Sequence, residues 1–190
     1  MTTLRPSTTA LVLIDLQHGI SSMELSPRSG DEVVTRSIEV ARRFRDAGAL
    51  VVLVRVAFSD DLADAPPHQV DHPMGPPAGG FPADWACLPG PLAELGHLTI
   101  TKRQWSAFHG TELDLQLRRR GCTTVAMGGI ATNFGVESTA RQAWELSYDV
   151  VVLEDLCTST SAELHGMAVT QVLPRLARVT TSACIKLGTA

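Results

Sequence analysis

The sequence predicts an α/β protein in which a parallel β-sheet is covered by helices on both faces. Three observations lead to this prediction. Short runs of aliphatic and β-branched residues alternate with helical periodicity along the 190 residues. The first of these runs is apolar throughout, which is typical of a strand buried on both sides. None of the expected strand pairs is joined by a turn as tight as a hairpin, so we expect parallel strands in one domain over residues 1–190.

The first expected strand covers residues 9–15 and ends in an acid. Asp15 closes the apolar run, and Gln17 follows two residues later. In open α/β sheets, functional sites gather at the carboxyl ends of the strands. Asp15 is therefore a candidate site residue. The alternative is that it caps a helix or lies in a solvated loop.

The chain from the first strand to the third contains two regular elements and a long irregular excursion. We expect a helix over residues 31–47 and a second buried strand over residues 49–56. Residues 59–91 then hold most of the prolines together with Phe81 and Trp85. Loops of this length in a compact domain are usually functional or disordered, and the aromatic residues argue against full disorder. A lid or an oligomer contact is one interpretation, and a variable surface loop is the other.

The third expected strand, residues 98–101, is followed at once by Lys102. A loop then leads to a helix that Thr111 can cap and that runs to Arg120. Lys102 therefore stands in the same relation to its strand as Asp15 does to the first strand.

The stretch 123–147 predicts a strand, a turn and a helix in direct succession. The two adjacent glycines at 128–129 are expected to break the strand, and Thr132 or Asn133 to cap the helix. Gly135 would leave open space beside the free N–H groups of the helix start, which can hold an anion or stabilise an oxyanion. The alternative is a plain strand-to-helix connection. The expected apolar stripe of this helix comprises Phe134, Ala140, Ala143, Trp144 and Ser147.

The rest of the chain continues the alternation of strands and helices. A fifth strand is expected over residues 149–153, a helix over about 162–173 and a last strand over 177–181. The tail from residue 184 to residue 190 is expected to fray or to pack weakly.

Composition excludes several classes of function. The net charge is −4 and there is no basic run, so we expect no nucleic acid partner. No apolar run is long enough to span a bilayer, and the first residues lack the order of a signal peptide, so no membrane partner is expected. The four scattered cysteines indicate free thiols in a reducing, cytoplasmic compartment. Metal-ligand spacing, dinucleotide motifs and phosphate-loop motifs are missing, so we expect no metal and no cofactor.

Three strand ends carry groups that could act together. Because parallel strands end at the same edge of a sheet, Asp15, Lys102 and the Gly135 helix start can converge there. A carboxylate beside an ammonium and a helix start suits acid/base chemistry on a small anionic or carbonyl substrate.

Three blocks of this sequence resemble the isochorismatase-like hydrolase superfamily. They are residues 13–17, residues 101–108 and residues 129–141, and they occur in the family's order in a resemblance that extends over nearly the whole chain. The resemblance implies a three-layer, Rossmann-like α/β/α sandwich with a six-stranded parallel sheet. It also implies a homo-oligomer, either a dimer or a tetramer, and a cis peptide bond between Ile130 and Ala131.

The resemblance also implies a catalytic triad of Asp, Lys and Cys in most members, which hydrolyse amides through a covalent intermediate. Asp15 and Lys102 match the first two positions, but Gly135 stands at the third. Covalent amide hydrolysis is therefore in doubt, because no nucleophile is left to form the acyl-enzyme. The metal motif of nicotinamidases is missing as well. By resemblance, the residues around the substrate are Gln17, Phe108, Ile130, Ala131 and Asn133.

Isochorismatases proper also have glycine at this position, and they hydrolyse a vinyl ether without a covalent intermediate. Asp15 would protonate the substrate if its pKa were raised, and Lys102 would position a substrate carboxylate. The block 131–134, however, is more similar to that of the cysteine hydrolases.

The leading hypothesis is a small-molecule hydrolase that uses Asp15 and Lys102 with an activated water. One alternative is an isochorismatase proper, and another is a catalytically silent small-molecule-binding protein. A silent protein would have no chemical reason to keep a buried acid and a buried ammonium, because both are costly to desolvate.

Overall fold

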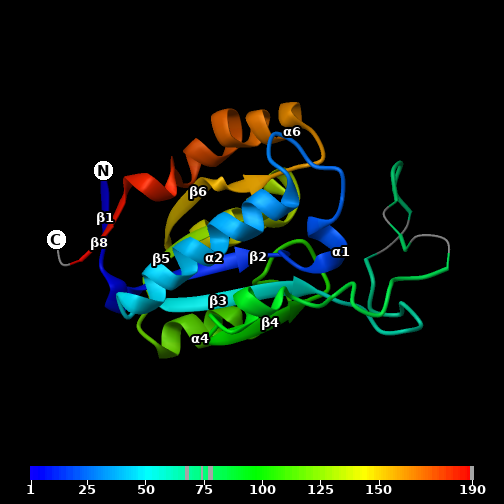
Figure 1. Cartoon of the computed structure of the whole chain (residues 1–190), viewed down its shortest axis with the longest axis horizontal. Coiled ribbons are helices and arrows are strands. Elements are labelled where there is room, and N and C mark those ends of the chain that lie inside the picture. The colour runs from blue at the N-terminus through cyan, green and yellow to red at the C-terminus, as the bar shows by residue number, and fades with distance from the viewer. Residues whose placement is uncertain (67–68, 74, 77–78, 189–190) are drawn as a thin grey trace.

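In a computed structural model, the chain forms a six-stranded sheet between layers of helices (Figure 1). The structure describes residues 1–66, 69–73, 75–76 and 79–188. The strand order is β4-β3-β2-β5-β6-β7, and every neighbouring pair is parallel. The predicted fold class, a six-stranded parallel sheet flanked by helices, is confirmed.

The elements have the following bounds. The strands are β1 (Thr2–Leu4), β2 (Thr9–Ile14), β3 (Leu50–Val56), β4 (Leu98–Lys102), β5 (Thr124–Ile130), β6 (Asp149–Thr158), β7 (Arg178–Thr180) and β8 (Ile185–Leu187). The α-helices are α1 (His18–Ser21), α2 (Gly30–Asp46), α3 (Gly90–Ala93), α4 (Leu113–Arg119), α5 (Glu137–Glu145) and α6 (Ala162–Met167). Two π-helical turns cover Thr132–Val136 and Ala168–Val172, and short 3-10 turns cover Pro6–Thr8, Leu173–Arg175 and Ser182–Cys184.

The topology places β2 and β5 side by side at the centre of the sheet. From β2 the chain runs outward through β3 to β4, returns to β5 and continues to β6 and β7. The strand order therefore reverses between β2 and β5, and ligands in open α/β sheets bind at such a point. Asp15 follows β2 directly, and the turn that contains Gly135 follows β5.

The core consists of two apolar layers, one on each face of the sheet. Leu11 and Leu13 of β2 pack in the layer that includes Phe44 of α2, while Val12 and Ile14 pack in the layer that includes Ala140 of α5. All six residues of β2 are buried because successive side chains point to opposite faces and both faces are covered. No helix in the described ranges is long and apolar enough to cross a membrane.

The adjacent glycines of β5 do not break the strand, so that prediction was wrong. The strand continues to Ile130, and Gly128 and Gly129 pair with Leu13 and Ile14 of β2. Gly129 has a φ of +140°, and a Cβ atom there would lie 2.1 Å from the carbonyl oxygen of Ile14. Glycine therefore lets two backbones approach each other closely.

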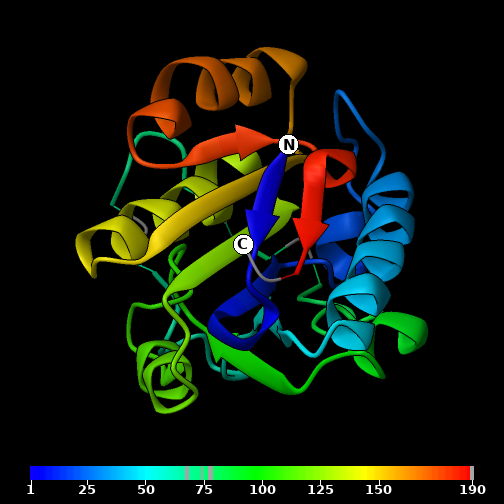
Figure 2. The same cartoon turned by 90° about the vertical axis from the view of Figure 1, so that its left-hand side faces the viewer.

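The C-terminal tail also differs from the expectation that it frays. Residues 185–187 form β8, which pairs in parallel with β1, and Figure 2 shows the two strands side by side. Ile185 and Leu4 are both buried in the layer that includes Phe44. The pair joins the two ends of the chain, which a local sequence pattern cannot reveal.

The buried face of α5 is rotated from the predicted one. Thr139, Ala140 and Ala143 are buried, whereas Trp144 is 56% exposed and Ser147 is exposed. The π-helical turn before α5 holds more residues per turn than an α-helix, so it shifts the phase of the stripe. Strand β6 is also longer than predicted, and the helix expected over 162–173 is divided among α6, a π-helical turn and a 3-10 turn.

We predict that Gly129→Ala lowers the free energy of unfolding by more than about 2 kcal/mol, because the new methyl group meets the Ile14 carbonyl in a strained conformation. Gly90→Ala is the matched control, because a Cβ atom there meets nothing within 4 Å. Urea unfolding of both variants measures the difference. Equal midpoints for the two variants would contradict this account of β5.

Candidate active site

Asp15 begins the site at the carboxyl end of β2. Its backbone N–H still donates to the carbonyl of Val54, 2.9 Å away, and its φ of +53° then turns the chain out of the sheet. The side chain is buried, and Oδ2 lies 2.7 Å from Nζ of Lys102. Oδ1 is buried and has no hydrogen-bond partner among the described residues. The carboxyl group therefore has one oxygen engaged and one unengaged.

Lys102 ends β4, which is two strands away from β2. Two strand spacings amount to roughly 10 Å, so only a long side chain can pass the end of β3 and reach Asp15. Nζ of Lys102 also donates to the carbonyl of Gln104 at 3.0 Å. Lys102 is 2% exposed and Asp15 is 5% exposed, so the pair is almost closed to solvent. The structure brings together the two charges that the strand ends predicted.

Burial raises the pKa of Asp15 to about 6, and the Lys102 ammonium lowers it less than burial raises it. A free aspartate has a pKa of about 4. Near neutral pH, the carboxyl group can therefore both take up and release a proton, which general acid/base catalysis requires.

Gly135 lies in the π-helical turn Thr132–Val136, directly beside Asp15. The open space that we expected there is not present. A Cβ atom on Gly135 would lie 3.2 Å from Oδ2 of Asp15 and 3.2 Å from Cγ2 of Ile14, so the carboxylate and a core side chain occupy the space. Glycine at this position lets Asp15 lie close to the helix start, and a larger residue would require the carboxylate or Ile14 to shift slightly.

The predicted helix caps have other partners. The hydroxyl of Thr132 donates to the carbonyl of Thr158 at 2.9 Å, and the amide oxygen of Asn133 accepts from the hydroxyl of Ser159. The carbonyl of Ala131 accepts from the N–H groups of Phe134 and Val136 instead. The peptide bond between Ile130 and Ala131 is cis. Both predicted caps thus fasten the turn to the end of β6.

Two further predicted site residues have other roles in the structure. Gln17 is buried, and its amide group exchanges two hydrogen bonds of 2.8 Å with the backbone of Val56. Its amide is thereby held by β3, beside Asp15. Phe108 is in the core, where its ring packs 5.8 Å from that of Tyr148, so the structure does not bring it to the site. The aromatic residue of this loop that lies beside the turn is Trp105, described below.

The excursion is anchored beside both charged residues of the site. The N–H of Gly19 donates to the carbonyl of Trp85 at 3.0 Å, and the Trp85 indole lies where a side chain at Gly19 would be. Phe81 packs on Trp85 with ring centroids 4.2 Å apart. Arg103, next to Lys102, forms an ion pair with Asp64. These contacts favour a lid or an oligomer contact rather than a variable surface loop. Residues 67, 68, 74, 77 and 78 lie outside the described part.

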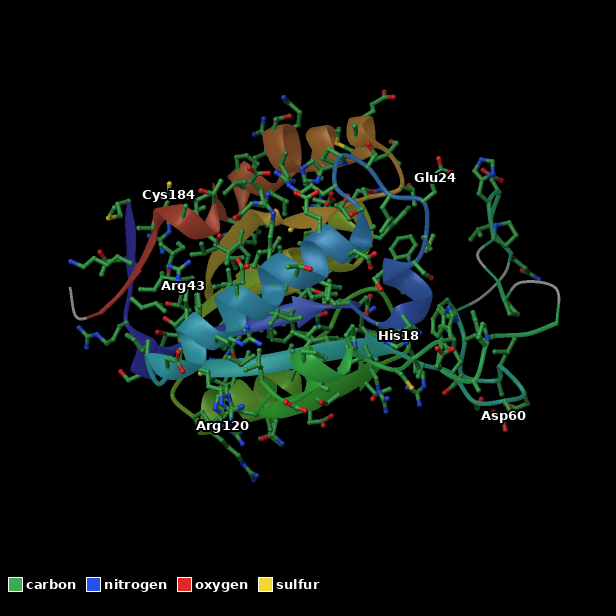
Figure 3. All side chains as sticks on the ribbon, viewed as in Figure 1. His18, Glu24, Arg43, Asp60, Arg120 and Cys184 are labelled. Carbon is green, nitrogen blue, oxygen red and sulfur yellow. The ribbon has the colours of Figure 1, made fainter. Side chains whose placement is uncertain are left out.

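Figure 3 shows where the excursion lies relative to the rest of the molecule. His18, which follows Gln17, and Asp60 of the excursion lie at one end, whereas Arg120 lies at the opposite end. The backbone N–H of His18 donates to the carbonyl of Cys87 at 2.9 Å, which adds a second contact between the excursion and the segment after Asp15. The excursion therefore belongs to the end of the molecule where β2 and β4 finish.

Sequence reasoning missed the contacts that join the Lys102 loop to α5. The hydroxyl of Thr139 donates to the carbonyl of Gly135 at 2.6 Å and accepts from the N–H of Ala107 at 3.0 Å. Trp105 packs on Phe134 with ring centroids 4.9 Å apart, and Trp105 is 47% exposed. An aromatic residue in each of two loops was the only available signal. Within the described ranges, no three His, Cys, Asp or Glu side chains are grouped so that they could hold a metal ion.

Comparison with known proteins identifies the family. Residues 9–184 match the model of the isochorismatase domain. The chain belongs to the isochorismatase family. An uncharacterized member from Escherichia coli O157:H7, YecD, is 49% identical over 94% of this chain and 95% of its own length. The structure of an isochorismatase family protein from Burkholderia thailandensis superposes with a TM-score of 0.89 at 43% identity, covering 96% of this chain and 95% of that one.

The family also includes relatives with a named reaction. Ureidoacrylate amidohydrolase RutB from Variovorax paradoxus is 30% identical, over 87% of this chain and 73% of its own length. Homology therefore relates this isochorismatase family chain to hydrolases.

We predict that the Asp15 carboxyl group titrates near pH 6 rather than near 4, as followed by the carboxyl carbon shift in NMR. Lys102→Met should raise the pKa further, because the ammonium that favours the ionised form is lost. Lys186→Met is the control, since this exposed lysine lies on β8. A midpoint near 4 in the unmodified protein would contradict the assigned effect of burial.

Proposed function

We propose that this isochorismatase family chain is a small-molecule hydrolase in which Asp15 and Lys102 assist the attack of water, without a covalent intermediate on the protein. The observation that carries the proposal is the buried pair in which Lys102 binds Oδ2 of Asp15 while Oδ1 has no partner within the part of the chain that the structure describes. A buried, unengaged carboxyl oxygen has a cost, and contact with a substrate would remove it. Gly135 lies beside Oδ2 of the same carboxyl group and has no side chain, so this position supplies no nucleophile.

Vinyl-ether hydrolysis is the first of two reactions that suit this site. Protonated Asp15 transfers its proton to the enol-ether carbon, which gives an oxocarbenium ion. Water then adds to the cationic carbon and returns a proton to Asp15, and the resulting hemiketal separates into a ketone and an alcohol. The raised pKa of Asp15 supports this reaction, since the acid form is then available near neutral pH.

Hydrolysis of a ureido or amide bond is the second reaction, and the relation to RutB favours it. Ionised Asp15 would take a proton from water as the water attacks the carbonyl carbon. Lys102 and the N–H groups of the turn after β5 would stabilise the oxyanion. The oxyanion would then collapse and break the C–N bond, while Asp15 gives the proton that it took from water to the leaving nitrogen. In this reaction Asp15 acts as a base, so its dependence on pH is opposite to that of the first.

We predict that pH distinguishes the two reactions in a panel of isochorismate, ureidoacrylate, nicotinamide and N-carbamoyl amino acids. If Asp15 is the acid, kcat/KM is constant below its pKa of about 6 and falls as pH rises above it. If Asp15 is the base, kcat/KM falls as pH decreases below the same value. Asp15→Asn should abolish activity, and Lys102→Ala should reduce it by roughly 30- to 1000-fold, or about 2–4 kcal/mol.

Asp46→Asn and Lys186→Ala are the matched controls for these variants, because both side chains are exposed. Full activity of Asp15→Asn would exclude the proposed mechanism. Tight binding of a compound from the panel without turnover would favour the silent binding protein instead.

We predict that Gly135→Cys slows the reaction of the unmodified protein. The new Cβ atom lies 3.2 Å from Oδ2 of Asp15, which is too close unless the carboxylate moves. Gly90→Cys is the control, since the space around Gly90 is open. Mass spectrometry of the protein under turnover tests for a covalent adduct. A faster Gly135→Cys variant with a trapped acyl-enzyme would show that the water mechanism is wrong.

A further inference from the structure

A second cluster of polar residues lies behind the turn that carries Gly135. His165 of α6 is buried, and its Nδ1 lies 2.9 Å from the hydroxyl of Thr132, the first residue of the turn. The same hydroxyl lies 2.9 Å from the carbonyl of Thr158 at the end of β6. Thr132 and Thr158 are both fully buried. The cluster therefore joins α6, the turn and β6 through one hydroxyl group.

The hydrogen-bond partners determine where the protons are. A carbonyl oxygen only accepts, so the single hydroxyl proton of Thr132 must go to Thr158. The hydroxyl oxygen must then accept from His165, which requires a proton on Nδ1. Burial, with the nearby Arg28, lowers the pKa of His165 despite the opposing effect of Glu154. The ring is then neutral at neutral pH, with its one proton on Nδ1.

The other side of the ring explains why Nε2 has only a weak partner. Oε2 of Glu154 lies 3.7 Å from Nε2, which is longer than a hydrogen bond, and 3.2 Å from Nη2 of Arg28. Arg28 also donates to the carbonyls of Glu154 and Cys157, at 3.1 and 3.2 Å. The Arg28 guanidinium group thus balances the charge of the Glu154 carboxylate. The hydrogen bond of the His165 ring is the one at Nδ1, to Thr132.

The position of this turn matters to Asp15. The Thr132 contact holds the first residue of the turn, and the Thr139 hydroxyl holds the carbonyl of Gly135 from α5. Between these two contacts, Gly135 passes Oδ2 of Asp15 so closely that even one added carbon would be tight. A small displacement of the turn therefore changes how the Asp15 carboxyl group is held.

We propose that His165 is a positioning residue of the site: by donating from Nδ1 to Thr132 it fixes the turn against which Asp15 lies. Its effect on kinetics rests on the proposed function, but its tautomer and its effect on the turn do not. Positioning errors of about 1 Å can reduce rates by roughly 100-fold. We therefore expect loss of the Nδ1 donor to reduce kcat by roughly 10- to 100-fold with little change in KM.

The first test observes the unmodified protein. Long-range ¹H–¹⁵N NMR of protein labelled at its six histidines distinguishes the two neutral tautomers, and the signal of His165 is assigned by its absence in His165→Asn. We expect the proton on Nδ1. A neutral ring that carries its proton on Nε2 would overturn the proposal, whatever the substrate is.

The second test compares two amides of different length. The amide nitrogen of His165→Asn occupies roughly the place of Nδ1 and can still donate to Thr132, whereas that of His165→Gln occupies roughly the place of Nε2. We expect His165→Asn to retain the slow hydrogen exchange of the N–H groups of residues 134–136, and His165→Gln to lose it. Equal exchange in both variants would overturn the proposal.

The kinetic test uses the substrate found in the panel, and Thr132 provides the partner variants. We expect His165→Asn and Thr132→Ser to keep kcat within a few fold of the unmodified value, and His165→Gln and Thr132→Val to lose it. The double variant His165→Gln/Thr132→Val should be no slower than either single variant, because both remove one interaction. Fully additive losses would show that the two residues act separately. If no compound of the panel is turned over, the proposed function fails, while the tautomer and the exchange rates still decide this inference.

Discussion

A carboxylate and an ammonium that are almost sealed from water must meet across the end of an intervening strand, and the rest of the site depends on this constraint. Burying either charge alone would cost several kcal/mol, and the attraction between the two charges offsets this cost. Lys102 is long enough to pass the end of β3, and Asp15 turns out of the sheet with a positive φ. The amide of Gln17 is hydrogen-bonded to the backbone of β3, and Gly135 leaves room for the Asp15 carboxylate. The glycine at 135, the amide of Gln17 and the positive φ of Asp15 all serve to accommodate this buried ion pair.

The sequence predicted the parallel sheet and the meeting of Asp15 with Lys102, because parallel strands end at one edge and both residues stand at the ends of strands. It could not predict features that depend on a segment that is distant in the sequence but adjacent in the fold. Glycines 128–129 resemble a break, since the pattern describes the local backbone and not the approach of Ile14. The strand of residues 185–187 exists only because β1 lies beside it. Phe108 has the same apolar character whether it lines a site or a core.

Membership of the isochorismatase family accounts for the fold and for the relation to hydrolases. In the mechanism that we propose no thiol takes part, so the proton transfers depend on the carboxyl group of Asp15. That group is held from several directions: by the ammonium of β4, by the helix start after β5 and, through Thr132, by a histidine of α6. Trp85 and Asp64 fasten the excursion to the segments that follow Asp15 and Lys102.

The pairing of β1 with β8 has a consequence for how the chain becomes ordered. Parallel strands require a crossover, and here the crossover is almost the entire protein. Bringing the two ends of so long a loop together costs conformational entropy. The contact therefore forms after the intervening sheet has brought both ends close to each other. This small sheet is therefore a late event in folding, and its backbone hydrogen bonds report on whether the whole chain has assembled. Residues 2–4 and 185–187 therefore pair only after the rest of the chain has folded.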